Sequence, residues 1–148
     1  MRDSLDGCNT RSMQQARIGG GSRYLLLAPP NPGRPTQALA TLVLGGLSAS
    51  VPVEEHYGGG FKDLAGFFAS MGRSWRGWRG RRTWESLEGE LALVAEHRGG
   101  VIELNVTLQR QAFGRGSDEW TVRGLLTIEP GDELTRVCQD LAAFARPA

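Results

Sequence analysis

A short stretch in the second half of the chain alternates strictly between apolar and polar side chains. Between residues 102 and 109, Ile, Leu, Val and Leu alternate with Glu, Asn, Thr and Gln. Successive side chains of a β-strand point to opposite faces of the sheet, so this stretch predicts a strand with one buried and one solvated face. The apolar face of such a sheet needs a second layer to cover it.

Five further segments have the composition of strands. They are residues 23–27, 39–44, 48–53, 91–95 and 120–128. Gly45 and Gly46 separate two of these segments and predict a tight hairpin turn. Residues 29–35 contain four prolines, which predicts a loop because proline lacks the N–H donor that a sheet interior needs.

Two segments have apolar residues at the three- and four-residue steps of a helical face. The apolar residues of the first are Phe61, Leu64, Phe68, Met71 and Trp75, and those of the second are Leu134, Val137, Cys138, Leu141 and Phe144. We therefore predict an α+β domain, in which an antiparallel sheet of about six strands packs against two helices in the order β-β-β-α-β-β-β-α. Phe68, Leu104 and Leu141 should meet in one core.

The chain of 148 residues has the length of one domain. Residues 1–22 lack apolar periodicity and contain three consecutive glycines, Gly19 to Gly21, which predicts a disordered tail, and residues 23–146 then form the single α+β domain. Seventeen basic and 16 acidic side chains give a net charge of +1, so no overall field attracts nucleic acid or a membrane. The longest early apolar run, residues 24–28, is too short for a membrane span.

The sequence contains no recognisable catalytic or cofactor-binding motif. Cys8 and Cys138 are far apart, which indicates neither a disulfide framework nor a metal site and fits a reducing cytoplasm. His56 and His97 are expected to be solvated loop residues, and no glycine-rich phosphate loop is present. We expect a protein that is not an enzyme and has no cofactor; a hydrolase with a site not recognisable from sequence is the alternative.

Residues 73–84, here called the tryptophan corner, contain three of the four tryptophans among arginines and glycines. Trp75 continues the buried stripe of the first helix and Trp84 begins a strand, so Trp78 is expected to be exposed. The predicted contact surface for a protein partner is Trp78, Arg79, Arg81 and Arg82, because Trp and Arg are favoured at binding hot spots. The alternative is a nucleic-acid-binding domain that uses residues 73–84, with arginines on phosphates and indoles on bases.

Residues 75–89, which read WRGWRGRRTWESLEG, resemble a motif of an uncharacterised actinobacterial family classed as a domain of unknown function. The resemblance covers residues 39–144. More distantly, the order of elements is similar to that of WapI-type immunity proteins, although their acidic bias is absent here. This similarity implies a small cytoplasmic antidote that binds a toxin, and it supplies no catalytic residue and no ligand.

Overall fold

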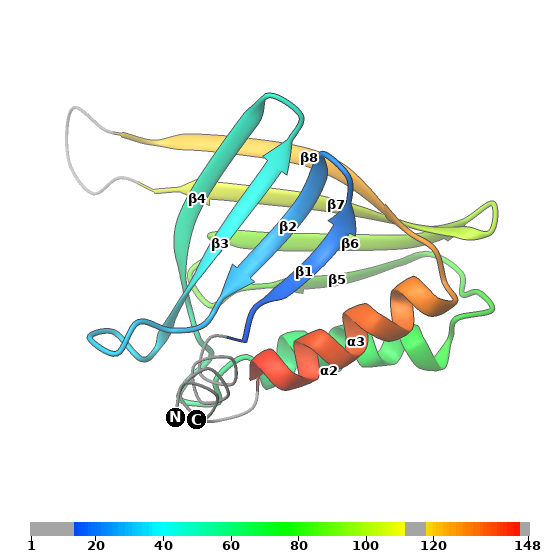
Figure 1. Cartoon of the computed structure of the whole chain (residues 1–148), viewed down its shortest axis with the longest axis horizontal. Helices are drawn as coiled ribbons and strands as arrows, with labels where there is room; N and C mark the ends of the chain where they lie inside the picture. The colour runs from blue at the N-terminus through cyan, green and yellow to red at the C-terminus, as the bar shows by residue number, and fades with distance from the viewer. Residues whose placement is uncertain (1–13, 112–117, 146–148) are drawn as a thin grey trace, which may run out of the picture.

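The structure is a computed structural model that describes residues 14–111 and 118–145. Within these residues the chain forms eight strands and two helices (Figure 1). The strands are β1 (Ala16–Gly20), β2 (Arg23–Ala28), β3 (Gln37–Leu44), β4 (Leu47–Glu54), β5 (Arg81–Glu85), β6 (Leu91–Arg98), β7 (Val101–Arg110) and β8 (Trp120–Ile128). The helices are α2 (Lys62–Arg73), between β4 and β5, and α3 (Asp132–Ala145), after β8.

The predicted α+β class is confirmed, but the strands form two sheets instead of one. Sheet 1 has the order β1-β2-β3-β4 and sheet 2 the order β5-β6-β7-β8, and every neighbouring pair is antiparallel. The two sheets lie face to face with their strands crossing at an angle (Figure 1). Each sheet has one apolar face, and stacking the sheets buries both apolar faces in one core.

The first strand lies inside the segment that the sequence assigned to a disordered tail. β1 pairs with β2, and its Ala16 and Ile18 are completely buried. The prediction that the tail extends to residue 22 is therefore wrong for this part, because two alternating apolar side chains are enough to bury one face of a short strand. The rest of the predicted tail, residues 1–13, lies outside the described residues.

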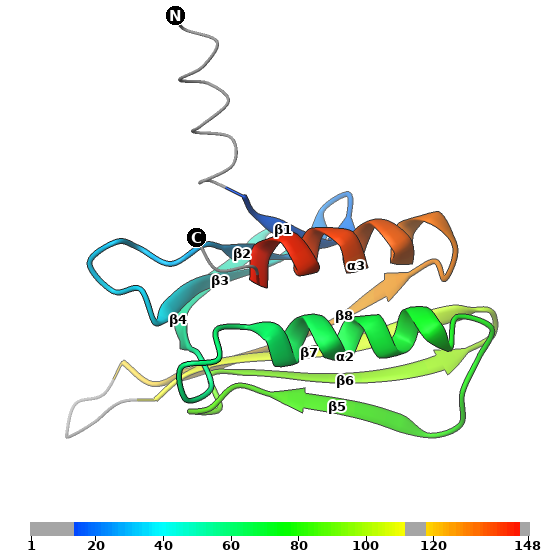
Figure 2. The same cartoon turned by 90° about the horizontal axis from the view of Figure 1, so that it is seen from below.

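The two helices pack against each other and fill the side of the molecule where the sheets diverge. Figure 2 shows α3 beside β1 of sheet 1 and α2 beside β5 of sheet 2, in agreement with the contacts between these elements. The helices thus cover one edge strand of each sheet. Phe68, Leu104 and Leu141 are all completely buried in a shared core, as predicted. Neither helix has the length and apolar character needed to cross a membrane.

Cys138 lies in the contact between the two helices. Its Sγ atom donates a hydrogen bond to the Phe68 carbonyl at 3.2 Å, and a Cβ atom on Gly72 would lie 3.3 Å from the same sulfur. Burial raises the pKa of the Cys138 thiol, an effect that a hydrogen bond with the Gly72 backbone partly opposes. The glycine lets α2 approach α3 closely, and the thiol acts as a small core group.

At the opposite side of the molecule the sheets contact each other directly. A Cβ atom on Gly124 of β8 would collide with the methyl groups of Leu44 of β3, so a side chain at this position would force Leu44 to move. Nearby, the Arg23 guanidinium donates to the carbonyl oxygen of Leu125 at 3.2 Å. These contacts fix the end of sheet 1 against β8.

Candidate functional site

The tryptophan corner connects the end of α2 to the start of β5. The Ser74 N–H closes the helix by donating to Met71 O at 3.1 Å and Ser70 O at 3.2 Å. The next turn is closed by the Gly77 N–H, which donates to Ser74 O at 2.9 Å. Gly77 and Gly80 have φ values of 146° and 77°, which favour glycine and let the chain reverse direction.

Arg82 connects β5 to the C-terminal end of α2. Its Nη1 donates to Ser70 O at 2.9 Å, and its Nη2 donates to Ser74 Oγ at 3.0 Å. The cation thus satisfies a carbonyl at the negative end of the helix dipole. The guanidinium also lies 4.5 Å from the centroid of the Trp78 ring, within cation–π distance.

Trp78 packs inward, between Arg82 and His97. Its ring meets the His97 ring edge-to-face, with centroids 5.3 Å apart, and it packs against the core. Its Nε1 atom is buried and has no hydrogen-bond partner among the described residues. Trp78 and Arg82 therefore stabilise the corner from within.

The structure reverses the expected exposure of Trp75 and Trp78. We predicted that Trp75 would continue the buried helical stripe, but α2 ends at Arg73 and 49% of Trp75 is exposed. Trp78, predicted to be exposed, is half-buried. The reason is the turn at residues 74–77, which ends the helical periodicity before Trp75. Trp84 lies in β5 and is buried, as expected from its place in a strand.

His56 lies in the loop between β4 and α2, as predicted, but the loop prediction is wrong for His97, and both rings have specific partners. His97 lies in β6, and its Nε2 atom is hydrogen-bonded to the carbonyl oxygen of Trp75 at 3.0 Å. The ring therefore fixes the backbone at Trp75 and also packs against Trp78. His97 could not be assigned this role from the sequence because Trp75 lies 22 residues earlier in the chain.

His56 belongs to a second cluster, at the opposite end of α2. Its Nε2 atom is 3.0 Å from the carbonyl oxygen of Glu85 and 3.4 Å from Asp63 Oδ2. The same Asp63 oxygen accepts a hydrogen bond from Trp84 Nε1 at 2.7 Å. Asp63 lies in the first turn of α2, where the negative charge of a carboxylate interacts favourably with the helix dipole. This cluster joins the beginning of α2 to the end of β5.

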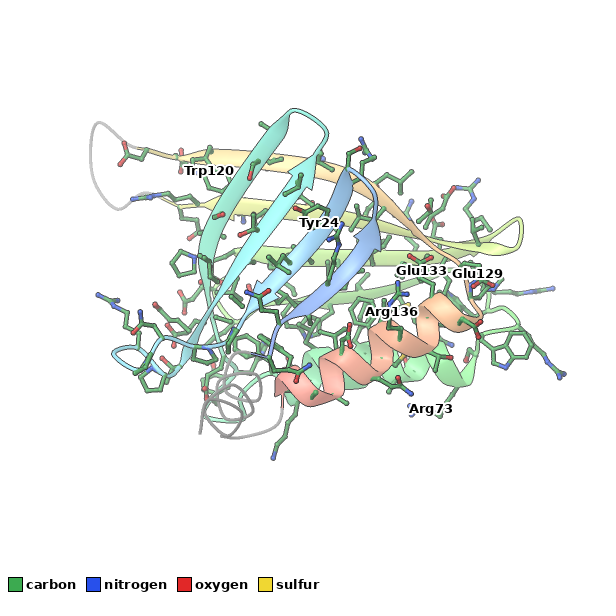
Figure 3. The ribbon with its side chains drawn as sticks, viewed as in Figure 1. Tyr24, Arg73, Trp120, Glu129, Glu133 and Arg136 are labelled. Carbon is green, nitrogen blue, oxygen red and sulfur yellow. The ribbon has the colours of Figure 1, made fainter. Side chains whose placement is uncertain are left out.

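A surface cavity of about 220 Å³ lies beside the exposed indole. It is lined by Gly72, Trp75, Pro130, Gly131, Asp132, Leu134 and Thr135. The cavity thus lies between the end of α2 and the beginning of α3. The first turn of α3 is already capped internally, because Gly131 N–H donates to Glu129 Oε2 at 3.0 Å and Glu129 N–H donates to Glu133 Oε1 at 2.8 Å. Figure 3 shows Glu129 and Glu133 at this end of α3.

The charged residues of the corner divide into two groups. Arg82 is directed inward, and Arg81 pairs with Glu96 on β6 at 3.8 Å. Arg73, Arg76 and Arg79 are exposed, and they take part in none of the ion pairs within residues 14–111 and 118–145. Arg76 lies 5.2 Å from the centroid of the Trp75 ring. In the same two ranges no three His, Cys, Asp or Glu side chains are grouped in a way that could hold a metal ion.

Fold and site together define a small α+β domain of two crossed sheets with an aromatic corner beside its helix pair. The chain belongs to a family of unknown function (DUF6228), whose model matches residues 21–148. This confirms the predicted resemblance to a family of unknown function, and β1 precedes the matched segment. No curated protein and no solved structure matches the chain.

Proposed function

We propose that the protein is a non-enzymatic binding domain, and that Trp75 is the centre of the surface with which it contacts another protein. The observation that carries the proposal is that 49% of this large aromatic residue is exposed beside a cavity of about 220 Å³. Buried tryptophans dominate protein interfaces because they bring a large apolar area and few rotatable bonds.

The backbone that carries Trp75 is fixed before any partner binds. The His97 ring is hydrogen-bonded to the Trp75 carbonyl, and the Gly77 N–H closes the turn that follows. Arg82 fixes the preceding helix end by binding Ser70 and Ser74. A partner therefore does not have to order this loop, and less binding free energy is lost on association.

The chemistry of the surface indicates the kind of partner that fits. The indole and the wall formed by Pro130 and Leu134 suit one apolar side chain. Beside the indole, Arg76 supplies positive charge that no ion pair within the described part of the chain uses, and on the opposite wall Asp132 supplies an exposed carboxylate. The partner should present an apolar side chain with a carboxylate on the side of Arg76 and no negative charge on the side of Asp132.

The proposal changes the roles of the four residues predicted from the sequence. Arg79 and Arg81 are exposed and belong to the contact surface, whereas Trp78 and Arg82 position it. The resemblance to immunity proteins makes a toxin the first partner to test. Protein is favoured over single-stranded nucleic acid because stacking on successive bases needs several exposed rings. In this corner Trp78 and Trp84 are occupied by internal contacts.

The test is affinity capture from extracts of the source cells with three baits: the wild type, Trp75→Ala and Leu125→Ala. Leu125 is the matched control because it is similarly exposed, at 39%, and lies on the outer face of sheet 2. We expect a protein that the wild type and Leu125→Ala retain and that Trp75→Ala loses. Equal capture by all three baits, or no capture by any, would contradict the proposal.

A parallel titration with a single-stranded oligonucleotide separates the two binding classes. We expect no binding at low salt. Binding that weakens steeply with salt and is lost in Trp75→Ala would replace the proposal with nucleic-acid recognition, since phosphate contacts release counterions. Thermal unfolding of each variant shows whether the fold is intact.

A further inference from the structure

We propose that the partner fills the cavity beside Trp75 with a lysine side chain, whose ammonium group lies against Asp132. The inference rests on the proposed function, because it names the partner residue that the same surface would bind. The apolar part of that residue is then the carbon stem of the lysine, which packs on the indole, and the ammonium group is its end. The hydrogen-bonding groups and the charge of the cavity wall on α3 both favour such a residue.

The wall of the cavity on α3 offers mainly hydrogen-bond acceptors. Thr135 Oγ1 donates its hydrogen to Gly131 O at 3.1 Å, so this oxygen can only accept a hydrogen bond from a ligand. Pro130 has no N–H group, and the Gly131 N–H donates to Glu129 Oε2 at 3.0 Å. Asp132 adds a carboxylate, which also only accepts. An ammonium group, with three donors and no acceptor, complements such a wall.

Asp132 is the carboxylate at this end of α3 that the chain leaves without a counter-charge. Its neighbours Glu129 and Glu133 each accept a hydrogen bond from a backbone N–H. Asp132 is exposed and belongs to none of the ion pairs within residues 14–111 and 118–145, and Arg136, one turn further along α3, does not pair with it. A partner that covers the cavity removes part of the water around this carboxylate. That loss of hydration costs free energy unless the partner supplies a cation.

The positive groups near the cavity do not oppose a cation strongly. The N-terminus of a helix carries a partial positive charge of about half a unit, which the carboxylates of Glu129, Asp132 and Glu133 outweigh at this end of α3. Arg76 lies 5.2 Å from the centroid of the Trp75 ring, but it is not among the residues that line the cavity. The indole itself attracts a cation that approaches its face, so Trp75 favours the ammonium group as well as the stem.

The size and the exposure of the cavity favour lysine over a free small molecule and over arginine. Its volume of about 220 Å³ is below the roughly 300–1,000 Å³ of sites that bind small molecules, so it suits a single side chain. Pro130 and the buried Leu134 provide an apolar wall for the stem. Asp132 is exposed, so the charged end of the ligand stays partly hydrated. A compact, strongly hydrated ammonium group suits this position, whereas a guanidinium group is favoured in ion pairs that are buried.

The test uses the purified full chain and four blocked tripeptides, in which glycine flanks lysine, norleucine, arginine or glutamate. Norleucine is the matched probe, because its side chain has the same unbranched run of carbon atoms as lysine but no ammonium group. Binding is followed by the NMR signal of the Trp75 indole N–H, which the spectrum of Trp75→Phe assigns. At low salt we expect the lysine peptide to bind about two- to fivefold more tightly than the norleucine peptide, the effect of one exposed ion pair. The arginine peptide should bind no more tightly than the lysine peptide, and the glutamate peptide should bind most weakly.

Two variants show whether the preference for lysine comes from Asp132. Asp132→Asn should abolish it while keeping the shape of the side chain, and Asp140→Asn should preserve it, because Asp140 lies on α3 but does not line the cavity. Thermal unfolding of each variant confirms that it is folded.

The outcomes separate this inference from the proposed function. Equal binding of the lysine and norleucine peptides, a preference that Asp132→Asn does not change, or tighter binding of arginine would overturn the lysine assignment and leave the proposed function standing. Binding of none of the four peptides would also overturn it. If the lysine preference is found but affinity capture yields no partner, the proposed function fails while the cation preference of the cavity is confirmed.

Discussion

The two sheets have the same number of strands and the same antiparallel order, but their outer faces differ. On sheet 2, Arg81 and Arg98 pair with Glu96 at 3.8 Å, and Arg98 also approaches Glu103 at 4.0 Å. On sheet 1 the corresponding contact is neutral, between the hydroxyl groups of Thr41 and Ser50 at 2.8 Å. The inner faces are alike because they form one core. The two sheets therefore differ in the side chains that their outer faces expose, which are charged on sheet 2 and mainly neutral on sheet 1.

The largest predicted effects test whether the inner faces are equivalent. Leu42 in sheet 1 and Leu104 in sheet 2 are both completely buried. Leu42→Ala and Leu104→Ala should each lower the free energy of unfolding by about 2–5 kcal/mol, because each removes buried apolar contacts and leaves a cavity. Denaturant unfolding followed by circular dichroism gives both values.

The outer positions provide the controls for this prediction. Leu39→Ala and Leu125→Ala remove leucines that are 44% and 39% exposed, and each should change the free energy of unfolding by less than about 1 kcal/mol. A loss at Leu42 no larger than the loss at Leu39 would show that sheet 1 does not share the core.

A smaller effect is expected where the sheets touch each other. Gly124→Ala places a Cβ atom against Leu44 Cδ2 and should lower the free energy of unfolding by about 1–3 kcal/mol through overpacking. Leu44→Ala removes the obstructing methyl groups, so the double variant should lose less than the sum of the two single variants. Strict additivity in this cycle would mean that β3 does not rest on β8 at this point.

The alternation of apolar and polar side chains predicted much of this fold. A strand that is buried on one face has an apolar residue at every second position, whether a helix or another sheet covers that face. The stretch 102–109 became β7, and the two helical stripes became α2 and α3. The number of sheets could not be predicted in this way, since a strand shows the same pattern whether its apolar face meets helices or another sheet. β1 was missed because only Ala16 and Ile18 carry its signal.

The sequence located the tryptophan corner correctly, but it did not predict which of the tryptophans at the corner is exposed. The helical spacing of apolar residues placed Trp75 on the buried stripe of the helix. The helix ends earlier, at Arg73, where Ser74 caps it and Arg82 of β5 binds its last turn. Gly77 was the local signal that the helix had ended. The role of His97 follows from the contact between β6 and the tryptophan corner, and no pattern in the sequence predicts that contact.

The smallest predicted effect separates the outer faces by their response to salt. Glu96→Gln removes the carboxylate that pairs with Arg81 and Arg98 and should lower the free energy of unfolding by about 0.5 kcal/mol at low salt. This loss should vanish in roughly 1 M salt, where charges more than about 3 Å apart are screened. Unfolding of both proteins at two salt concentrations measures it.

Thr41→Val is the counterpart on sheet 1, because it removes a neutral hydrogen bond to Ser50 while keeping the shape of the side chain. Its effect on the free energy of unfolding should be of similar size but the same at both salt concentrations, since no ionic attraction is lost. If the Glu96→Gln loss also persists in high salt, the ion pairs of sheet 2 contribute no electrostatic stability.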